Sequence, residues 1–120
     1  MRPYVCIIHS MSKLLACDLD GTLFYPKQVG RCISKRNVRF LRRWIDAGNK
    51  LVLITSRSLE FVERLKKEIE RPFDVMACTS AQTVHEGELV RHIWMSNSEL
   101  EKVFQKIDEK YKPLGYLLSA

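Results

Sequence analysis

Short aliphatic runs and longer amphipathic stretches alternate along the first two thirds of the chain. Continuous apolar runs are typical of buried strands, and apolar residues three or four positions apart are typical of helices with one covered face. The runs predict strands at about Lys13–Cys17, Lys50–Ile54 and Phe73–Cys78. The stretches between them predict helices at about Ser34–Ala47 and Ser58–Glu70. This order predicts a Rossmann-like α/β fold, with a parallel sheet, right-handed crossovers and flanking helices.

The ends of both helices carry local signals. Ser34 is a suitable N-cap for the first helix, and Gly48 suits the left-handed residue that follows its last turn. Arg71-Pro72 ends the second helix, because proline cannot continue it. The run Lys50–Ile54 is aliphatic without interruption, which predicts that helices cover both faces of this strand.

After the third predicted strand the pattern changes. Two segments, Thr83–His85 and Leu89–Trp94, lie on either side of Glu86-Gly87-Glu88 and predict a β-hairpin. Ser98-Glu99-Leu100-Glu101 has the form of a capping box and predicts the start of another helix. The apolar residues of that helix are expected on one face: Leu100, Val103, Phe104, Ile107 and Tyr111. A further strand is expected at Tyr116–Leu118.

Candidate chemistry gathers where the first two predicted strands end. Asp18 and Asp20 follow the first strand, and Thr55 and Ser56 follow the second. Residues two apart in extended backbone point to the same side, so both carboxylates can face one site. In parallel sheets ligands bind at the carboxyl ends of the strands. The sequence therefore predicts one functional site formed by these four residues.

A surface turn or a calcium loop would also use Asp and Gly. An EF-hand needs a further acidic or Asn position and a distal Glu, whereas Leu23, Phe24 and Tyr25 follow the carboxylates here. The apolar run Lys13–Cys17 is typical of a buried parallel strand rather than of a hairpin arm. We therefore favour a strand-end site over a turn.

At these two strand ends the chain resembles the haloacid dehalogenase (HAD) superfamily, most of whose members are magnesium-dependent phosphohydrolases. Residues 18–23, Asp-Leu-Asp-Gly-Thr-Leu, are similar to its first signature, and residues 51–57, Leu-Val-Leu-Ile-Thr-Ser-Arg, resemble its second. A hairpin followed by a helix resembles the Cof or sugar-phosphatase type, in which a hairpin leads into an α/β (C2) cap. The resemblance implies an extension at residues 1–12, a partial HAD-like core at 13–94 and the beginning of a cap at 95–120.

The resemblance also implies roles for the two carboxylates. Asp18 would be the nucleophile that forms an aspartyl-phosphate, and Asp20 the general acid and later the base. An oxygen of Asp18 and the backbone carbonyl of Asp20 would be ligands of Mg²⁺, a hard cation that suits carboxylate, phosphate and water oxygens. The cofactor expected from the resemblance is therefore Mg²⁺.

The substrate phosphate is expected at Gly21, Thr55, Ser56 and Arg57. Gly21 permits a sharp turn, and Thr55 and Ser56 precede a helix N-terminus, where free N–H groups and the dipole favour anions. The alternative for Thr55 and Ser56 is simple N-capping of the second helix, and for Arg57 a position in solvent. His85 and His92 are expected at the surface rather than as ligands.

Two further family signatures, a charge-neutralising Lys and an acidic Gly-Asp-x-x-x-Asp, have no counterpart here, and Asp74 and Asp108-Glu109 do not fit the latter. Many relatives of the Cof type carry Asn-Gly after the third strand, where this chain has Thr79-Ser80-Ala81. We therefore expect the N-terminal portion of a phosphatase for a small phosphorylated metabolite, such as a sugar phosphate. The alternatives are a non-catalytic phosphate-binding or regulatory module and, less favoured, a CheY-like receiver.

The chain has 120 residues and a net charge of +6. Many of its cations lie on the first predicted helix: Lys35, Arg36, Arg39, Arg42 and Arg43. They would attract a polyanion or form a solvated helix face, and we favour the latter because no nucleic-acid-binding motif accompanies them.

No apolar run approaches a membrane span, so neither nucleic acid nor membrane is an expected partner. The four cysteines lack metal-site spacing, which favours a reduced, cytoplasmic protein. Met11 is the more natural start, with residues 1–10 as an extension. The first strand would leave an apolar sheet edge, which a second copy or another partner would cover.

Overall fold

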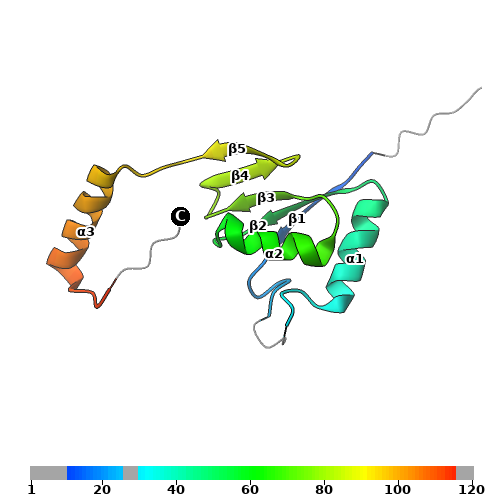
Figure 1. The fold of residues 1–120 in the computed structure, drawn as a ribbon, viewed down its shortest axis with the longest axis horizontal. Coiled ribbons are helices and arrows are strands. Elements are labelled where there is room, and N and C mark those ends of the chain that lie inside the picture. Colours follow the sequence, from blue (N-terminus) through cyan, green and yellow to red (C-terminus); the bar gives the residue numbers. More distant parts are fainter. Residues whose placement is uncertain (1–10, 26–29, 116–120) are drawn as a thin grey trace, which may run out of the picture.

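The computed structural model describes residues 11–25 and 30–115, and in this part the elements follow the predicted order (Figure 1). The strands and helices are β1 (Leu14–Asp18), α1 (Lys35–Asp46), β2 (Lys50–Ile54), α2 (Leu59–Ile69), β3 (Asp74–Ala77), β4 (Gln82–His85), β5 (Glu88–His92) and α3 (Asn97–Tyr111). The strand expected at Tyr116–Leu118 and the extension at residues 1–10 lie outside the described residues. None of the described helices is long and apolar enough to cross a membrane.

The five strands form one sheet in the order β1-β2-β3-β4-β5. β1, β2 and β3 are parallel, while β4 and β5 add an antiparallel hairpin beside β3. The predicted parallel α/β arrangement and the predicted hairpin are both confirmed. Within the described residues β1 pairs only with β2, so its other edge is open, as expected, and Leu14 on this strand is 65% exposed.

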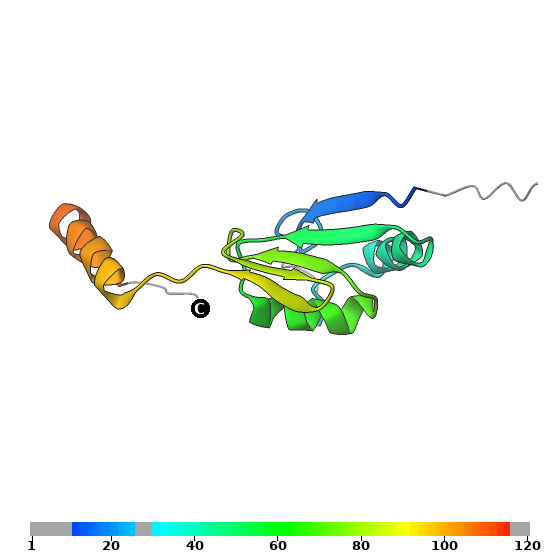
Figure 2. The same cartoon turned by 90° about the horizontal axis from the view of Figure 1, so that it is seen from above.

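The two helices between the parallel strands cover only one face of the sheet. Because neighbouring strands follow the chain order, crossovers of the same hand place α1 and α2 on the same side (Figure 2). Leu51 and Leu53 of β2 face these helices and are buried. Ile54, which points to the other face, is 39% exposed. The prediction that helices cover both faces of this strand is therefore wrong for the described part of the chain.

The apolar core lies between the sheet and these two helices. Its main cluster consists of ten buried residues: Leu19, Leu23, Cys32, Ile33, Val38, Leu41, Leu51, Leu53, Leu65 and Ile69. The loop that follows β1 supplies four of them, so this loop is packed against the helices and is not a free surface segment. Its packing fixes the start of the loop, where the candidate carboxylates lie.

The helix ends follow the predicted signals in three cases out of four. Gly48, with a φ of 83°, is the left-handed residue expected after α1. The Ser34 side chain accepts a hydrogen bond from the Asn37 N–H at 3.2 Å, so it caps α1 as expected. α2 ends at Glu70, whose φ of 53° is left-handed, directly before Arg71-Pro72. The capping box of α3 was predicted at Ser98, but Ser96 and Glu99 form it. The chain contains two overlapping Ser-x-x-Glu patterns, and using the first adds residues to the helix.

α3 lies apart from the sheet, beyond β5, in both views of the ribbon (Figures 1 and 2). None of its residues is buried. Val103 and Tyr111, two members of its predicted apolar face, are 40% and 65% exposed. The helix is confirmed, whereas the division into a core and the beginning of a cap stays a prediction.

Candidate active site

The turn after β1 holds the first carboxylate at the end of the strand. Asp18 is the last residue of β1 and is exposed, while Leu19 next to it is fully buried. The Leu19 carbonyl accepts hydrogen bonds from the backbone N–H groups of residues 22, 23 and 24, at 3.2, 3.0 and 2.8 Å. Gly21 has a φ of 77°, which glycine adopts without steric cost. The sharp turn predicted at Gly21 is thus present.

One oxygen of Asp18 is held by the same turn. The Thr22 hydroxyl donates to Asp18 Oδ2 over 3.0 Å. The other carboxylate oxygen has no hydrogen-bond partner among the described residues. Asp18 therefore presents a fixed carboxylate with one oxygen available to a ligand or an electrophile.

Thr55 lies beside this turn, at the end of the neighbouring strand. Asp18 is paired with Ile54 in the β1–β2 register, so Thr55 is one residue further along. Thr55 is 4% exposed, and its Oγ1 accepts a hydrogen bond from the Arg57 N–H at 3.1 Å. This contact holds the turn before α2, and the hydroxyl proton remains available. At the N-cap of α2 stands Ser58, which makes no side-chain capping hydrogen bond.

Arg57 and Asp20 form an ion pair that the sequence reasoning missed. Arg57 Nε lies 2.9 Å from both carboxylate oxygens of Asp20, and Arg57 Nη2 lies 2.6 Å from Oδ1. The guanidinium stacks against the rings of Phe24 and Phe61, 4.7 and 4.1 Å from their centroids. The hydrogen bonds from Arg57 lower the pKa of Asp20, and those to Asp20 raise the pKa of Arg57. The two side chains are 44% and 34% exposed, so solvent screens the pair.

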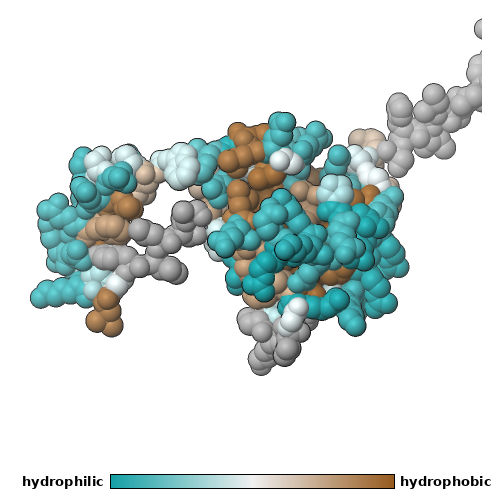
Figure 3. All heavy atoms as spheres, viewed as in Figure 1, coloured by the Kyte–Doolittle hydropathy of each residue, from teal (hydrophilic) through white to brown (hydrophobic). Residues whose placement is uncertain are grey.

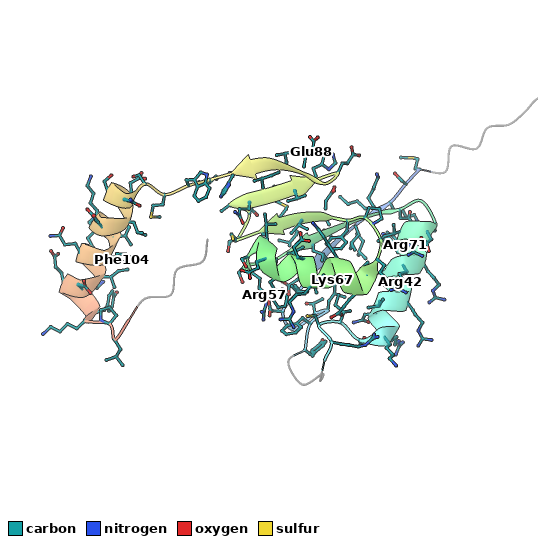
Figure 4. The ribbon with its side chains drawn as sticks, in the orientation of Figure 1. Arg42, Arg57, Lys67, Arg71, Glu88 and Phe104 are labelled. Carbon is teal, nitrogen blue, oxygen red and sulfur yellow. The ribbon has the colours of Figure 1, made fainter. Side chains whose placement is uncertain are left out.

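This ion pair fixes the position of the Arg57 side chain, whereas its contact with substrate stays a prediction. The side chain does not simply extend into solvent, because Asp20 and the two rings hold it near the end of β1. Figure 4 shows Arg57 at the end of α2 that faces this loop. The only sequence signal for this arrangement was the presence of the aromatic residues Phe24 and Phe61. Their spacing along the chain does not indicate that both rings contact the guanidinium of Arg57.

A second missed feature is the turn after β3. Cys78, Thr79 and Ser80 have φ values of 47°, 54° and 70°, an unusual run of left-handed residues without glycine. The Cys78 N–H donates to the Arg57 carbonyl at 2.9 Å, and the Thr79 N–H to the Thr55 carbonyl at 3.1 Å. The turn thus supports the Thr55–Arg57 segment. Thr79-Ser80 stands where many relatives have Asn-Gly, a pair that adopts left-handed angles readily. That correspondence was the sequence signal for a left-handed turn at this position.

The structure therefore brings Asp18, Asp20, Thr55 and Arg57 together at the carboxyl ends of β1 and β2, with Ser56 exposed between the last two. The two histidines of the described part lie away from this site: His85 pairs with Asp74 at 2.8 Å, and His92 contacts Gln82 at 3.0 Å.

For a metal ion, the site offers the hard oxygen donors that Mg²⁺ prefers, namely the Asp18 carboxylate and the Asp20 backbone carbonyl. Among the described residues no three His, Cys, Asp or Glu side chains come close enough to hold a metal ion together. The donors present fit Mg²⁺ in kind.

Solved structures with the same fold include haloacid dehalogenase-like hydrolases and a phosphatase. A haloacid dehalogenase-like hydrolase from Bacteroides thetaiotaomicron has a TM-score of 0.67 and 24% identity, over 82% of this chain and 38% of its own. A phosphatase of the haloalkanoate dehalogenase superfamily from the same organism has a TM-score of 0.67 and 23% identity, over 91% and 38%. A haloacid dehalogenase-like hydrolase from B. subtilis has a TM-score of 0.67 and 25% identity, over 82% and 34%. The chain thus spans little more than a third of these proteins.

The sequence itself gives the family. A search of curated proteins finds no significant match. The sequence model of the haloacid dehalogenase-like hydrolases matches residues 15–119, which include both signature segments and α3. This match covers well over half of the chain, and the fold and strand-end residues agree with it. The protein belongs to the haloacid dehalogenase-like hydrolase family.

Proposed function

We propose that this chain carries the phosphoryl-transfer site of a magnesium-dependent phosphohydrolase that acts on a small phosphorylated metabolite, such as a sugar phosphate. The observation that carries the proposal is the position of Asp18. An exposed carboxylate, fixed by Thr22 at 3.0 Å, stands at the end of a parallel strand beside the nearly buried Thr55. A nucleophile held next to a hydroxyl donor and a helix N-terminus suits attack on a phosphate.

In the first step the free oxygen of Asp18 attacks phosphorus and the bond from phosphorus to the leaving oxygen breaks. This gives an aspartyl-phosphate and an alcohol, whose oxygen takes up a proton. In the second step water attacks phosphorus, gives up a proton, and releases inorganic phosphate and the Asp18 carboxylate. Splitting hydrolysis in this way replaces one difficult displacement by two easier ones.

Asp20 is the group placed to exchange those protons. In the present arrangement its carboxylate is paired with Arg57, and in that charged form it accepts a proton, as the second step requires. To donate a proton in the first step, the ion pair must open. A substrate phosphate that attracts the guanidinium of Arg57 would provide the competing acceptor.

The phosphate itself would be held by groups at the two strand ends. The Thr55 hydroxyl, the Ser56 N–H and Arg57 precede α2, and the N-terminus of this helix favours an anion. Mg²⁺ held by the Asp18 carboxylate and the Asp20 carbonyl would offset the negative charge that opposes the approach of phosphate to a carboxylate. The described residues supply no further acidic ligand, which supports the alternative of a phosphate-binding module without turnover.

Phosphate release from p-nitrophenyl phosphate tests the proposal. We expect turnover that needs Mg²⁺ and falls by about 10³-fold or more in Asp18→Asn. Asp46→Asn is the matched control, because Asp46 is also an exposed carboxylate but lies at the C-terminal end of α1, where it contacts Arg71. Equal activity in Asp18→Asn and the wild type would show that Asp18 is not the nucleophile. A folded chain that binds inorganic phosphate through Thr55 but shows no turnover would establish the binding module instead.

A further inference from the structure

A basic groove lies between α1 and α2, away from the strand ends. It is a hollow of about 500 Å³. Five of its lining residues are basic: Arg31, Lys35, Arg39, Arg42 and Lys67. Figure 4 shows Arg42 and Lys67 where the two helices approach each other, and Figure 3 shows that the surface over these helices is mostly hydrophilic. Two acidic residues, Glu68 and Glu70, also line the groove.

The two acidic side chains are already engaged by the protein. Glu68 accepts hydrogen bonds from the backbone N–H groups of Cys32 and Ile33, at 2.6 and 2.9 Å. Glu70 forms an ion pair with Arg42 at 3.1 Å. Arg42 also donates to the carbonyls of residues 68 and 69 and is thereby fixed at the end of α2. Both carboxylates keep their negative charge and offset part of the positive charge, but the groove still holds five basic residues against two acidic ones.

The remaining four cations have no ion pair or hydrogen bond with a described residue: Arg31, Lys35, Arg39 and Lys67. They come from the segment before α1, from α1 and from α2, so tertiary folding and not helix periodicity alone brings them to one hollow. Some other cations in the described part have carboxylate partners, as Arg57, Lys66 and Arg71 show, and others, such as Arg36 and Arg43, form no ion pair with a described residue.

The position of Lys35 adds a second argument. It is the first residue of α1, and the first turn of this helix has no acidic residue. The positive end of a helix dipole favours an anion, and a lysine there is unfavourable unless an anion joins it. Lys35 lines the groove, so the helix N-terminus and the unpaired cations present their positive charge to the same hollow.

We propose that this groove binds a small, multiply charged, phosphate-bearing anion, at a site separate from Asp18 and Thr55. Guanidinium groups bind phosphate oxygens in bidentate fashion, and two of the unpaired cations are arginines. The size of the hollow, about 500 Å³, suits a small ligand, whereas nucleic acid or a membrane would need an extended basic surface. The site therefore goes beyond the proposed phosphatase reaction and does not depend on it.

Titration of the wild-type chain with sodium tripolyphosphate, in the absence of Mg²⁺ and at low ionic strength, tests this site by calorimetry and amide NMR shifts. We expect shifts at Arg31, Lys35 and Lys67. The variant Arg39→Gln/Lys67→Gln should bind about tenfold more weakly or worse. The matched control is Arg36→Gln/Arg43→Gln, which removes the same charge from α1 outside the groove and should change the affinity by less than about threefold. Thermal melting checks that each variant is folded. If a double variant does not fold, its two single variants are tested instead.

The variant Arg57→Gln separates the groove from the candidate active site. Binding in the groove should survive this change, because Arg57 does not line it. Loss of binding in Arg57→Gln with full binding in Arg39→Gln/Lys67→Gln would place the anion at the strand ends and overturn the proposal. Equal weakening by the groove and control pairs would show only general attraction to a basic protein. Binding of duplex DNA or anionic vesicles without binding of tripolyphosphate would equally overturn it.

Discussion

α2 and α3 have similar sequence patterns and opposite surroundings. Both place apolar residues three or four positions apart, and both begin after a serine N-cap. α2 packs on the sheet, and its residues Val62, Leu65 and Ile69 are buried. α3 buries none of its residues against the described part of the chain, although its N-terminal capping box is complete. An amphipathic pattern thus predicts a helix with one apolar face that is more stable when buried. It does not identify the part of the protein that buries this face.

The two helices also differ in what holds them. α2 is fixed by apolar burial and by tertiary contacts of Glu68, with the segment before α1, and of Arg42 in α1. α3 buries no residue, and its start is held by local hydrogen bonds between Ser96 and Glu99. Local interactions alone stabilise a helix of this length only weakly in water. We therefore expect α2 to unfold with the sheet and α3 to open separately, at a lower free-energy cost.

The largest expected difference concerns leucine in the two helices. Leu65→Ala should lower the free energy of unfolding by about 3 kcal/mol, because Leu65 is fully buried and alanine would leave a cavity. Leu100→Ala in α3 should cost less than about 0.5 kcal/mol, since that side chain is only half-buried. Urea unfolding followed by tryptophan fluorescence and circular dichroism measures both. Equal losses would mean that α3 packs in solution as firmly as α2 does, and the comparison would fail.

A smaller difference is expected for two glutamates that accept backbone hydrogen bonds. Glu68 uses both carboxylate oxygens for the N–H groups of Cys32 and Ile33, and the amide of a glutamine would present a donor to one of them. Glu68→Gln should therefore lower the free energy of unfolding by about 1–2 kcal/mol. Glu99→Gln should lower it much less, because glutamine also serves in a capping box.

Chemical denaturation of the wild type and the two glutamine variants at neutral pH checks this prediction. A cost for Glu99→Gln as large as that for Glu68→Gln would show that the start of α3 is coupled to the cooperative unit. The calorimetric transition of Glu68→Gln should stay single, because Glu68 joins two parts of that unit and does not divide it.

Much of the fold follows from short-range patterns. β2 was predicted with its bounds, Lys50–Ile54, and α1 and α2 within one residue at each end, because apolar runs, caps and proline act locally. That the helices cover only one face of the sheet could not be predicted from such local patterns. The aliphatic run of β2 indicates an apolar environment, but the position of both helices on one side depends on strand order, which no local signal in β2 contains.

The candidate site shows the same division. Parallel strand ends brought Asp18 and Thr55 to neighbouring positions, as the sequence predicts for adjacent strands. The pair between Arg57 and Asp20 was missed, because it depends on the path of the loop after β1 and on the rings of Phe24 and Phe61. The left-handed turn at Cys78–Ser80 was missed because these residues rarely adopt such angles. The roles of these residues in catalysis stay predictions.

The smallest effect in the comparison is a pH dependence that differs between the hairpin beside the core and α3. His85 in β4 hydrogen-bonds to Asp74, which raises the pKa of His85 above its ordinary value of 6.5, and the nearby Glu86 adds to the shift while Lys50 opposes it. A raised pKa in the folded state means stabilisation that is complete below pH 6.5 and is lost as the pH rises through the higher, folded value.

Raising the pH from about 6 to about 8 should therefore lower the melting temperature of the wild type slightly more than that of His85→Gln. α3 should respond at the acid end instead. Hydrogen bonds from Ser96 lower the pKa of Glu99 below its ordinary value of 4.5, so their contribution is present above that pH and is lost as the pH falls through the folded value. NMR pH titrations of the His85 ring and of the amides of Ser96 and Glu99 distinguish the two responses. A common transition of both groups would show that the hairpin and α3 unfold as one unit, contrary to their different burial.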